Sequence, residues 1–193
     1  MKRVTIFCGS SLGWDKIFEE QAYLLGKALA NEGIGVVYGG AKVGLMGAVA
    51  DGALAHGGEV IGVLPRFLMH KEIAHAHLND LILVDTMHER KFKMNELSNG
   101  IIALPGGFGT LEELFEMLTW AQLGLHQKPI GLLNTAGFYD ELFAFIDTME
   151  GKGFLKPVHQ NLFVKSADAE ELLQKLKDHQ VPQVKKWMSR DDL

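Results

Sequence analysis

Seven short apolar segments, separated by stretches with helical periodicity, constrain the fold of this 193-residue chain more than any other feature. Most of them are continuously apolar and often β-branched, instead of alternating between apolar and polar residues. Such runs are typical of parallel strands that are buried on both faces of a sheet. The expected strands cover residues 3–8, 34–39, 59–65, 81–85, 100–105, 129–134 and 161–165.

The stretches between these segments predict amphipathic helices. In the first, Phe18, Ala22, Leu25 and Leu29 recur every three or four residues, and Gly33 follows as a stop signal. Because strands and helices alternate, we expect right-handed βαβ units in an α/β fold, with a doubly wound, mostly parallel sheet and helices on both faces. One domain would span residues 1–180, followed by a C-terminal tail of residues 181–193. The other helices are expected at roughly 43–56, 86–98, 110–123, 138–150 and 168–179.

The composition allows a sizeable core without covalent or metal support. Apolar residues make up 47% of the chain and charged residues 22%. The single cysteine, Cys8, cannot form an intramolecular disulfide, which fits a reducing compartment. No apolar run approaches the ~18 residues of a membrane span, and the N-terminus lacks a secretory signal, so we expect a cytoplasmic protein. A net charge of −5 argues against nucleic-acid binding but not against a small anionic ligand.

Three of the expected strands end in glycine-rich loops: CGSSLG after the first, YGGAKVGLMG after the second and LPGGFGT after the fifth. Since parallel strands end at the same edge of a sheet, these loops suggest a shared ligand site. Two common nucleotide motifs are incomplete. Glu112 stands where the dinucleotide fingerprint needs its third glycine, and Leu45 and Met46 replace the lysine and hydroxyl of a P-loop. A monophosphate bound by backbone N–H groups at a helix start remains compatible.

Two charged residues are candidates for chemistry, and each has a structural alternative. Arg90 shares a helical stripe with Met87 and Met94, so it is either a snorkelling side chain or a cation directed into a cleft. Glu113 follows Thr110 by three residues, which is the spacing of a capping box with Thr110 as the N-cap. Local geometry favours the cap for Glu113, but a cap does not account for the glycines beside it.

A histidine-bearing segment, HKEIAHAH, covers residues 70–77. Its histidines are His70, His75 and His77, and the His75-x-His77 pair together with Glu72 could bind a metal. No cysteine cluster or second row of carboxylates accompanies them, and metal sites normally need such a set. We therefore expect no metal in this protein.

The segment MHERKFKMNELSNGIIALPGGFGTLEELFEMLTWAQLGLHQKPIGLLN, residues 87–134, resembles the core of the LOG (Lonely Guy) family. These proteins are cytokinin riboside 5′-monophosphate phosphoribohydrolases, formerly described as possible lysine decarboxylases. The family motif P-G-G-x-G-T-x-x-E is complete from Pro105 to Glu113, with Arg90 and Lys91 at the expected separation before it. The segments CGSS and YGGAKVGLMGAVADGAL also match, so the resemblance covers roughly residues 3–165.

The resemblance implies a Rossmann-like homodimer that hydrolyses the N-glycosidic bond of adenine or cytokinin nucleoside 5′-monophosphates, giving free base and ribose 5-phosphate. It implies that Arg90 and Glu113 are the catalytic pair and that no cofactor is needed. Two other classes stay open, a non-hydrolytic AMP-binding or regulatory module and, less compatible with the chain's size, a pyridoxal-phosphate-dependent decarboxylase. The positions implied to contact substrate are Glu72, Lys91, Gly106, Gly107, Phe108, Gly109, Thr110 and Glu112, with Ser10, Gly39 and Gly40 in more variable loops.

The implied residues suit the implied reaction. Cleavage of the C1′–N bond develops oxocarbenium character on the ribose and negative charge on the leaving base. A carboxylate such as Glu113 can stabilise the sugar cation or activate water, and Arg90 can hold phosphate or sugar oxygens. N–H groups of Gly107, Gly109 and Thr110 at a helix start would bind the 5′-phosphate.

Overall fold

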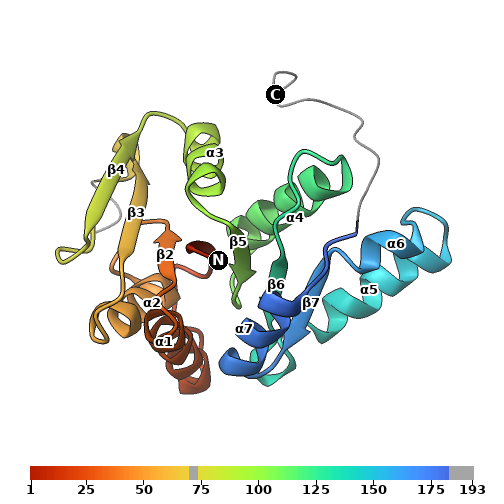
Figure 1. Cartoon of the computed structure of the whole chain (residues 1–193), viewed down its shortest axis with the longest axis horizontal. Helices are drawn as coiled ribbons and strands as arrows, with labels where there is room; N and C mark the ends of the chain where they lie inside the picture. The colour runs from red at the N-terminus through yellow and green to blue at the C-terminus, as the bar shows by residue number, and fades with distance from the viewer. Residues whose placement is uncertain (70–73, 183–193) are drawn as a thin grey trace.

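The computed structural model describes residues 1–69 and 74–182, and within them seven strands form one parallel sheet (Figure 1). The order across the sheet is β4-β3-β2-β1-β5-β6-β7. All neighbouring strands pair in parallel. The bounds are β1 Arg3–Phe7, β2 Gly35–Tyr38, β3 Val60–Pro65, β4 Asp80–Val84, β5 Gly100–Ala103, β6 Ile130–Leu133 and β7 Phe163–Ser166.

Helices connect these strands at the positions that the sequence predicts. Asp15 caps α1 by accepting from the Ile17 N–H at 3.1 Å, and Gly33, with a φ of 66°, follows its end. The short helix α6, which starts at a proline, and two 3₁₀ turns, Arg66–Leu68 and Thr135–Gly137, were not expected. The helices are α1 Lys16–Asn31, α2 Gly44–Leu54, α3 Met87–Leu97, α4 Phe108–Gln122, α5 Asp140–Gly151, α6 Pro157–Gln160 and α7 Ala169–Asp178.

Both faces of the sheet are covered. One apolar cluster contains Ile6 and Ile102 together with residues of α1, α2 and α7. The other contains Phe7 and Ile101 together with residues of α3, α4 and α5. Successive residues of one strand thus enter opposite clusters, which explains why the strands are continuously apolar. The predicted doubly wound, parallel sheet with helices on both faces is confirmed.

The chain changes direction next to β1. Strands β2, β3 and β4 extend the sheet from one side of β1, and β5, β6 and β7 extend it from the other (Figure 1). At such a switch point the loops after neighbouring strands diverge to opposite faces, which leaves a crevice at the carboxyl edge. The loops after β1, β2 and β5 are the three glycine-rich ones, so they share this edge.

Some sequence predictions fall outside what the structure tests. Glu72 and residues 183–193 of the expected tail lie outside the described residues. The division into a domain of residues 1–180 and a tail stays a prediction. None of the helices in residues 1–69 and 74–182 has the length and apolar character needed to cross a bilayer.

Candidate active site

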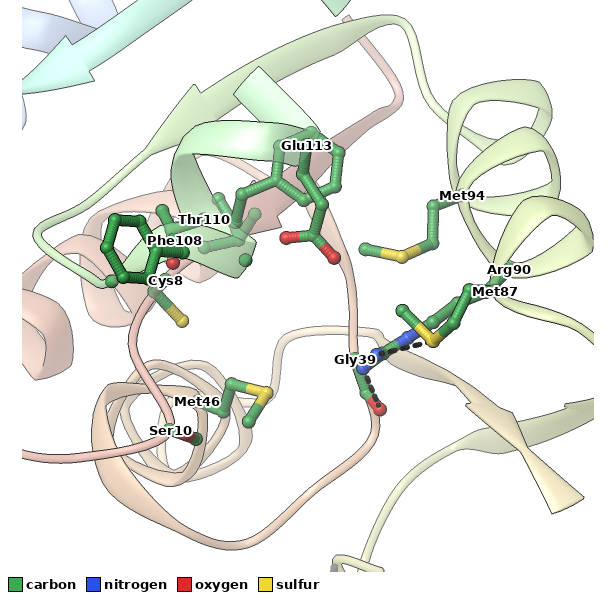
Figure 2. Close-up of a pocket in the computed structure, with 14 residues that line it drawn as sticks. Cys8, Ser10, Gly39, Met46, Met87, Arg90, Met94, Phe108, Thr110 and Glu113 are labelled. Atoms are coloured by element: carbon green, nitrogen blue, oxygen red, sulfur yellow. Dashed lines mark hydrogen bonds between the residues drawn. The ribbon is translucent and has the colours of Figure 1, made fainter. Parts of the chain in front are cut away.

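A cavity of about 300 Å³ lies at the carboxyl edge beside the switch point (Figure 2). Each of the three glycine-rich loops contributes to its wall, as the sequence predicts, and α3 closes the opposite side. The cavity borders both apolar clusters, because Met46 belongs to one and Met94 to the other. Its lining residues are Ile6, Phe7, Cys8, Ser10, Gly39, Met46, Met87, Arg90, Met94, Gly107, Phe108, Gly109, Thr110 and Glu113.

Arg90 enters the cavity from α3 and is buried (Figure 2). Its Nε donates to the Val63 carbonyl at 3.0 Å, and its Nη2 donates to the Gly39 carbonyl at 2.9 Å. The guanidinium is therefore fixed at the ends of β3 and β2, and the snorkelling alternative is wrong. Because these partners are neutral carbonyls, they orient the positive charge without cancelling it.

Helix α4 begins three residues earlier than the capping-box hypothesis requires, because its N-cap is residue 107 instead of residue 110. Gly107 is the N-cap, and the Leu111 N–H donates to its carbonyl at 3.1 Å. Thr110 is the third helical residue, and it is buried against Gly106, where a Cβ would lie 2.1 Å from the Thr110 Oγ1. The prediction that Thr110 caps the helix and pairs with Glu113 is thus wrong. Gly107 has no side chain that could cap the helix, so the first N–H groups of α4 are available to an anion.

The glycines at the start of α4 are not explained by the protein's own packing. A Cβ added to Gly107 or to Gly109 would meet no atom within 4 Å. Neither residue has a positive φ; Gly107 has φ −94° and ψ −154°. Glycine is also useful where another molecule approaches the backbone closely. Both residues line the cavity, so they keep its floor accessible to a ligand.

The Glu113 side chain projects from α4 into the same cavity (Figure 2). Burial raises the pKa of its carboxyl to about 7, against an opposing effect of Arg90. Glu112 and Glu116 raise this pKa further, and Lys91 lowers it, each by a smaller amount than burial. A carboxyl group that titrates near neutral pH can both take up and release a proton during a reaction.

Sulfur-containing side chains form much of the remaining wall. Met46, Met87 and Met94 line the cavity together with Cys8. Burial raises the pKa of the Cys8 thiol, so this group is a neutral part of the wall. The sequence reasoning missed the methionines as site residues. The one sequence pattern that pointed to any of them is the helical stripe that Arg90 shares with Met87 and Met94.

Several predicted substrate contacts do not line this cavity. Among the described residues, Lys91, Glu112 and Gly40 lie outside its lining. Gly106 lines a neighbouring cavity of about 330 Å³, which shares Ser10 and Gly107 with the first. The roles of these residues toward a substrate stay predictions, as does that of Glu72.

Two histidines of the segment considered for a metal, His75 and His77, have other contacts, and His70 lies outside the described residues. The buried His75 pairs through Nε2 with the Asp51 carboxylate at 3.0 Å, and its backbone N–H donates to the Gly40 carbonyl at 3.0 Å. His77 lies next to it, with the two ring centroids 6.1 Å apart. Groups of three or more ligating side chains suited to a metal do not occur in residues 1–69 and 74–182.

Comparisons with known proteins identify similar chains. A family model described as possible lysine decarboxylase matches residues 46–176. The probable cytokinin riboside 5′-monophosphate phosphoribohydrolase LOGL9 of Oryza sativa subsp. japonica is 47% identical over 178 residues, covering 92% of this chain and 78% of that protein. The cytokinin riboside 5′-monophosphate phosphoribohydrolase LOG5 of Arabidopsis thaliana is 48% identical over 175 residues, covering 91% of this chain and 77% of that protein.

Solved structures of other proteins have the same fold as this chain. A molybdenum cofactor binding protein from the phototrophic bacterium Rippkaea orientalis superposes with a TM-score of 0.69 at 26% identity, covering 92% of this chain and 96% of that chain. The molybdenum cofactor carrier protein of Chlamydomonas reinhardtii gives a TM-score of 0.68 at 23% identity, covering 91% and 96%. At 23% identity the match shows the fold alone.

Proposed function

The chain belongs to the LOG family of cytokinin riboside 5′-monophosphate phosphoribohydrolases, and on this premise we propose that it hydrolyses the N-glycosidic bond of adenine or cytokinin nucleoside 5′-monophosphates. The products are a free base and ribose 5-phosphate. The relatives that carry this name are similar over more than nine tenths of the chain, and the chain in turn covers more than three quarters of each.

The observation that carries the proposal is the meeting of Arg90 and Glu113 in one cavity, beside the start of α4, where the N-cap Gly107 offers no capping side chain (Figure 2). The two side chains come from different helices, so their convergence is a property of the fold and not of a local pattern. A 5′-phosphate bound at the start of α4 would place the ribose next to Glu113, whose position is one turn further along the helix.

This arrangement suits glycoside hydrolysis. In the ionised form, Glu113 stabilises the oxocarbenium character at C1′ or takes a proton from the attacking water. The water oxygen bonds to C1′, the C1′–N bond breaks with its electron pair on the base, and the proton that the water loses is passed to the base nitrogen. Arg90 stays positively charged throughout and can hold phosphate or sugar oxygens.

The test is an assay of base release. Purified protein is incubated with AMP and with N6-prenylated AMP, and free base and ribose 5-phosphate are measured by chromatography. Release of base that depends on Glu113 supports the proposal. A non-hydrolytic binding module would bind AMP in calorimetry without releasing adenine, and this result would overturn the proposal.

We also propose that the protein is a homodimer in the cytoplasm, as the sequence and the resemblance predict. An apolar groove of about 210 Å³ between α4, α5 and α6 supports an interface between copies, because it is lined by Phe115, Leu118, Met149 and Leu155. Phe154, which also lines the groove, is 85% exposed, and exposed apolar groups at such a groove are typical of interaction sites. Light scattering after size-exclusion chromatography would measure the mass, and a monomer at micromolar concentration would contradict the dimer.

A further inference from the structure

A buried cation joins the two helices that carry the proposed catalytic pair. Lys91 of α3 lies with its Nζ 2.5 Å from Glu112 Oε1 and 3.1 Å from Glu116 Oε1, both on α4. Lys91 directly follows Arg90, and Glu112 directly precedes Glu113. The ion pairs therefore connect the helices at the level of the cavity.

The two carboxylates differ in their surroundings. The side chain of Lys91 is 8% exposed and that of Glu116 is 18% exposed, whereas that of Glu112 is 56% exposed. Glu116 Oε2 is also buried, and it has no hydrogen-bond partner among the residues that the structure describes. Exposed ion pairs contribute little to stability, but removal of one partner from a buried pair leaves an uncompensated charge. Glu116 is thus the partner on which the position of Lys91 depends most.

Lys91 is held as a cation despite its burial. Burial opposes its charge, but hydrogen bonds to Glu112 and Glu116 outweigh this effect and raise the pKa of Lys91. The cation therefore forms its ion pairs with these two carboxylates, and it acts on Glu113 only through space, where it lowers the pKa of that carboxyl. If Glu116 did not hold it, Lys91 would be available to pair with Glu113 or with a bound anion.

We propose that Glu116 is a positioning residue of this site: by holding Lys91 across the gap between α3 and α4, it fixes Arg90 relative to Glu113. The inference rests on the proposed hydrolysis for its kinetic test. The same ion pair also sets where Lys91 would meet a substrate, the contact that the family resemblance implies for this residue.

The charges of Lys91 and Glu116 also affect the pKa of Glu113, in opposite directions. The charged groups that act on Glu113 are Arg90 and Lys91 from α3, and Glu112 and Glu116 from its own helix. The thiol of Cys8 lines the same cavity from the loop after β1 and is neutral. Loss of the Glu116 charge lowers the pKa of Glu113, because it removes a repulsion and frees Lys91. Loss of Lys91 raises the pKa of Glu113, because it removes an attraction.

The experiment compares Glu116→Gln with Lys91→Met by two measurements. The first is the pH dependence of kcat/KM for release of adenine from AMP. The second is an NMR titration of ¹³C-labelled glutamate carboxyls, in which the Glu113 signal is assigned by its loss in Glu113→Gln. We expect the midpoint of Glu113 to move down in Glu116→Gln and up in Lys91→Met, each by at least ~0.3 pH unit. Because Arg90 would no longer be fixed relative to Glu113, Glu116→Gln should also lower kcat about tenfold, with a smaller change in KM.

Glu96→Gln is the matched control. It removes a carboxylate from the exposed pair of Lys93 and Glu96 on α3, whose N–O distance is 2.8 Å, and should leave both measurements unchanged. Unchanged midpoints in both test variants, or shifts in the same direction, would overturn the proposal.

Failure of this inference and failure of the proposed function give different experimental results. If the wild type releases no base, the proposed function fails, while the NMR midpoints still decide whether Glu116 and Lys91 act on Glu113. If Glu116→Gln does not fold, Glu116→Asp takes its place. Aspartate keeps the charge but shortens the reach, so kcat should fall while the midpoint of Glu113 moves less than in Lys91→Met. An unchanged kcat in that variant would overturn the positioning role.

Discussion

The guanidinium of Arg90 lies directly against the backbone of Gly39. Its Nη2 donates to the Gly39 carbonyl at 2.9 Å, and a Cβ on residue 39 would lie only 2.1 Å from the same nitrogen. Gly39 does not have a positive φ, unlike its neighbour Gly40, whose φ is 82°. Glycine at position 39 is therefore required by the arginine side chain and not by the conformation of the loop.

We predict that Gly39→Ala displaces Arg90 and lowers kcat/KM about 10²-fold, since a shift of about 1 Å in a catalytic group can have an effect of this size. The measurement is base release from AMP, with circular dichroism to confirm the fold. Gly151→Ala on α5 is the control, because a Cβ there would meet no atom within 4 Å. A folded Gly39→Ala variant with wild-type kcat/KM would contradict the role assigned to Arg90.

We predict that Glu113→Gln lowers kcat by about 10²-fold or more, because general acid–base groups contribute about 10²–10⁴. Glutamine keeps the shape of the side chain but cannot ionise, so binding of AMP measured by calorimetry should be largely retained. Glu141→Gln, at an exposed position in the first turn of α5, serves as a charge-matched control. A folded Glu113→Gln enzyme within threefold of the wild-type kcat would show that the carboxylate is not the catalyst.

The sequence predicts the sheet well because the physical requirement behind it is simple. A strand such as β1 sends Ile6 to one apolar cluster and Phe7 to the other, so a parallel strand inside two helical layers must be apolar at every position. The meeting of the three glycine-rich loops follows for the same reason, because parallel strands end at one edge. Neither inference needs knowledge of side-chain contacts.

The start of α4 could not be predicted, because a capping-box pattern does not say which residue begins the helix. Thr110 and Glu113 have the right spacing, but Thr110 packs beneath Gly106 and the helix already begins at Phe108. The ion pairs of Lys91 could not be predicted from the sequence either. Its partners lie 21 and 25 residues away on another helix, so only the folded chain brings these charges together.

The glycines at the start of α4 give a prediction that separates stability from function. Gly109 is inside the helix, without a positive φ and without a neighbour within 4 Å of its Cβ position. We predict that Gly109→Ala leaves the protein as stable as the wild type or up to about 1 kcal/mol more stable, since alanine is the better helix former. The KM for AMP should nevertheless rise, because the new methyl group lies over the N–H groups proposed to bind phosphate.

Gly151→Ala is again the control, since it makes the same change in a helix remote from the cavity. Urea denaturation measures the stability of both variants, and initial rates measure their KM. If Gly109→Ala had an unchanged KM, the start of α4 would not be the phosphate site. Gly106→Ala should behave differently from both, with lower stability, because its Cβ would clash with Thr110.

The raised pKa of Glu113 predicts a pH-dependent cost in stability. Its carboxyl titrates at about 7 in the folded protein and near its usual value of 4.5 in the unfolded chain. Between these two values the folded state binds more protons, so the free energy of unfolding falls as the pH rises, by about 1.4 kcal/mol per pH unit. The glutamine of Glu113→Gln does not titrate, so the free energy of unfolding of this variant lacks this decrease with rising pH. Relative to the wild type, the variant should therefore be stabilised by about 2–3 kcal/mol more at pH 8 than at pH 5.

Urea denaturation at the two pH values measures this difference, and the comparison at each pH cancels the titration of all other groups. Glu141→Gln, at an exposed position of α5, is measured in parallel at both pH values as a control for the substitution itself. An equal effect of Glu113→Gln at both pH values would mean that the carboxyl ionises as easily in the folded chain as in the unfolded one. In that case burial in the cavity would not hold its proton, and a role as a neutral-pH acid or base would lose its physical basis.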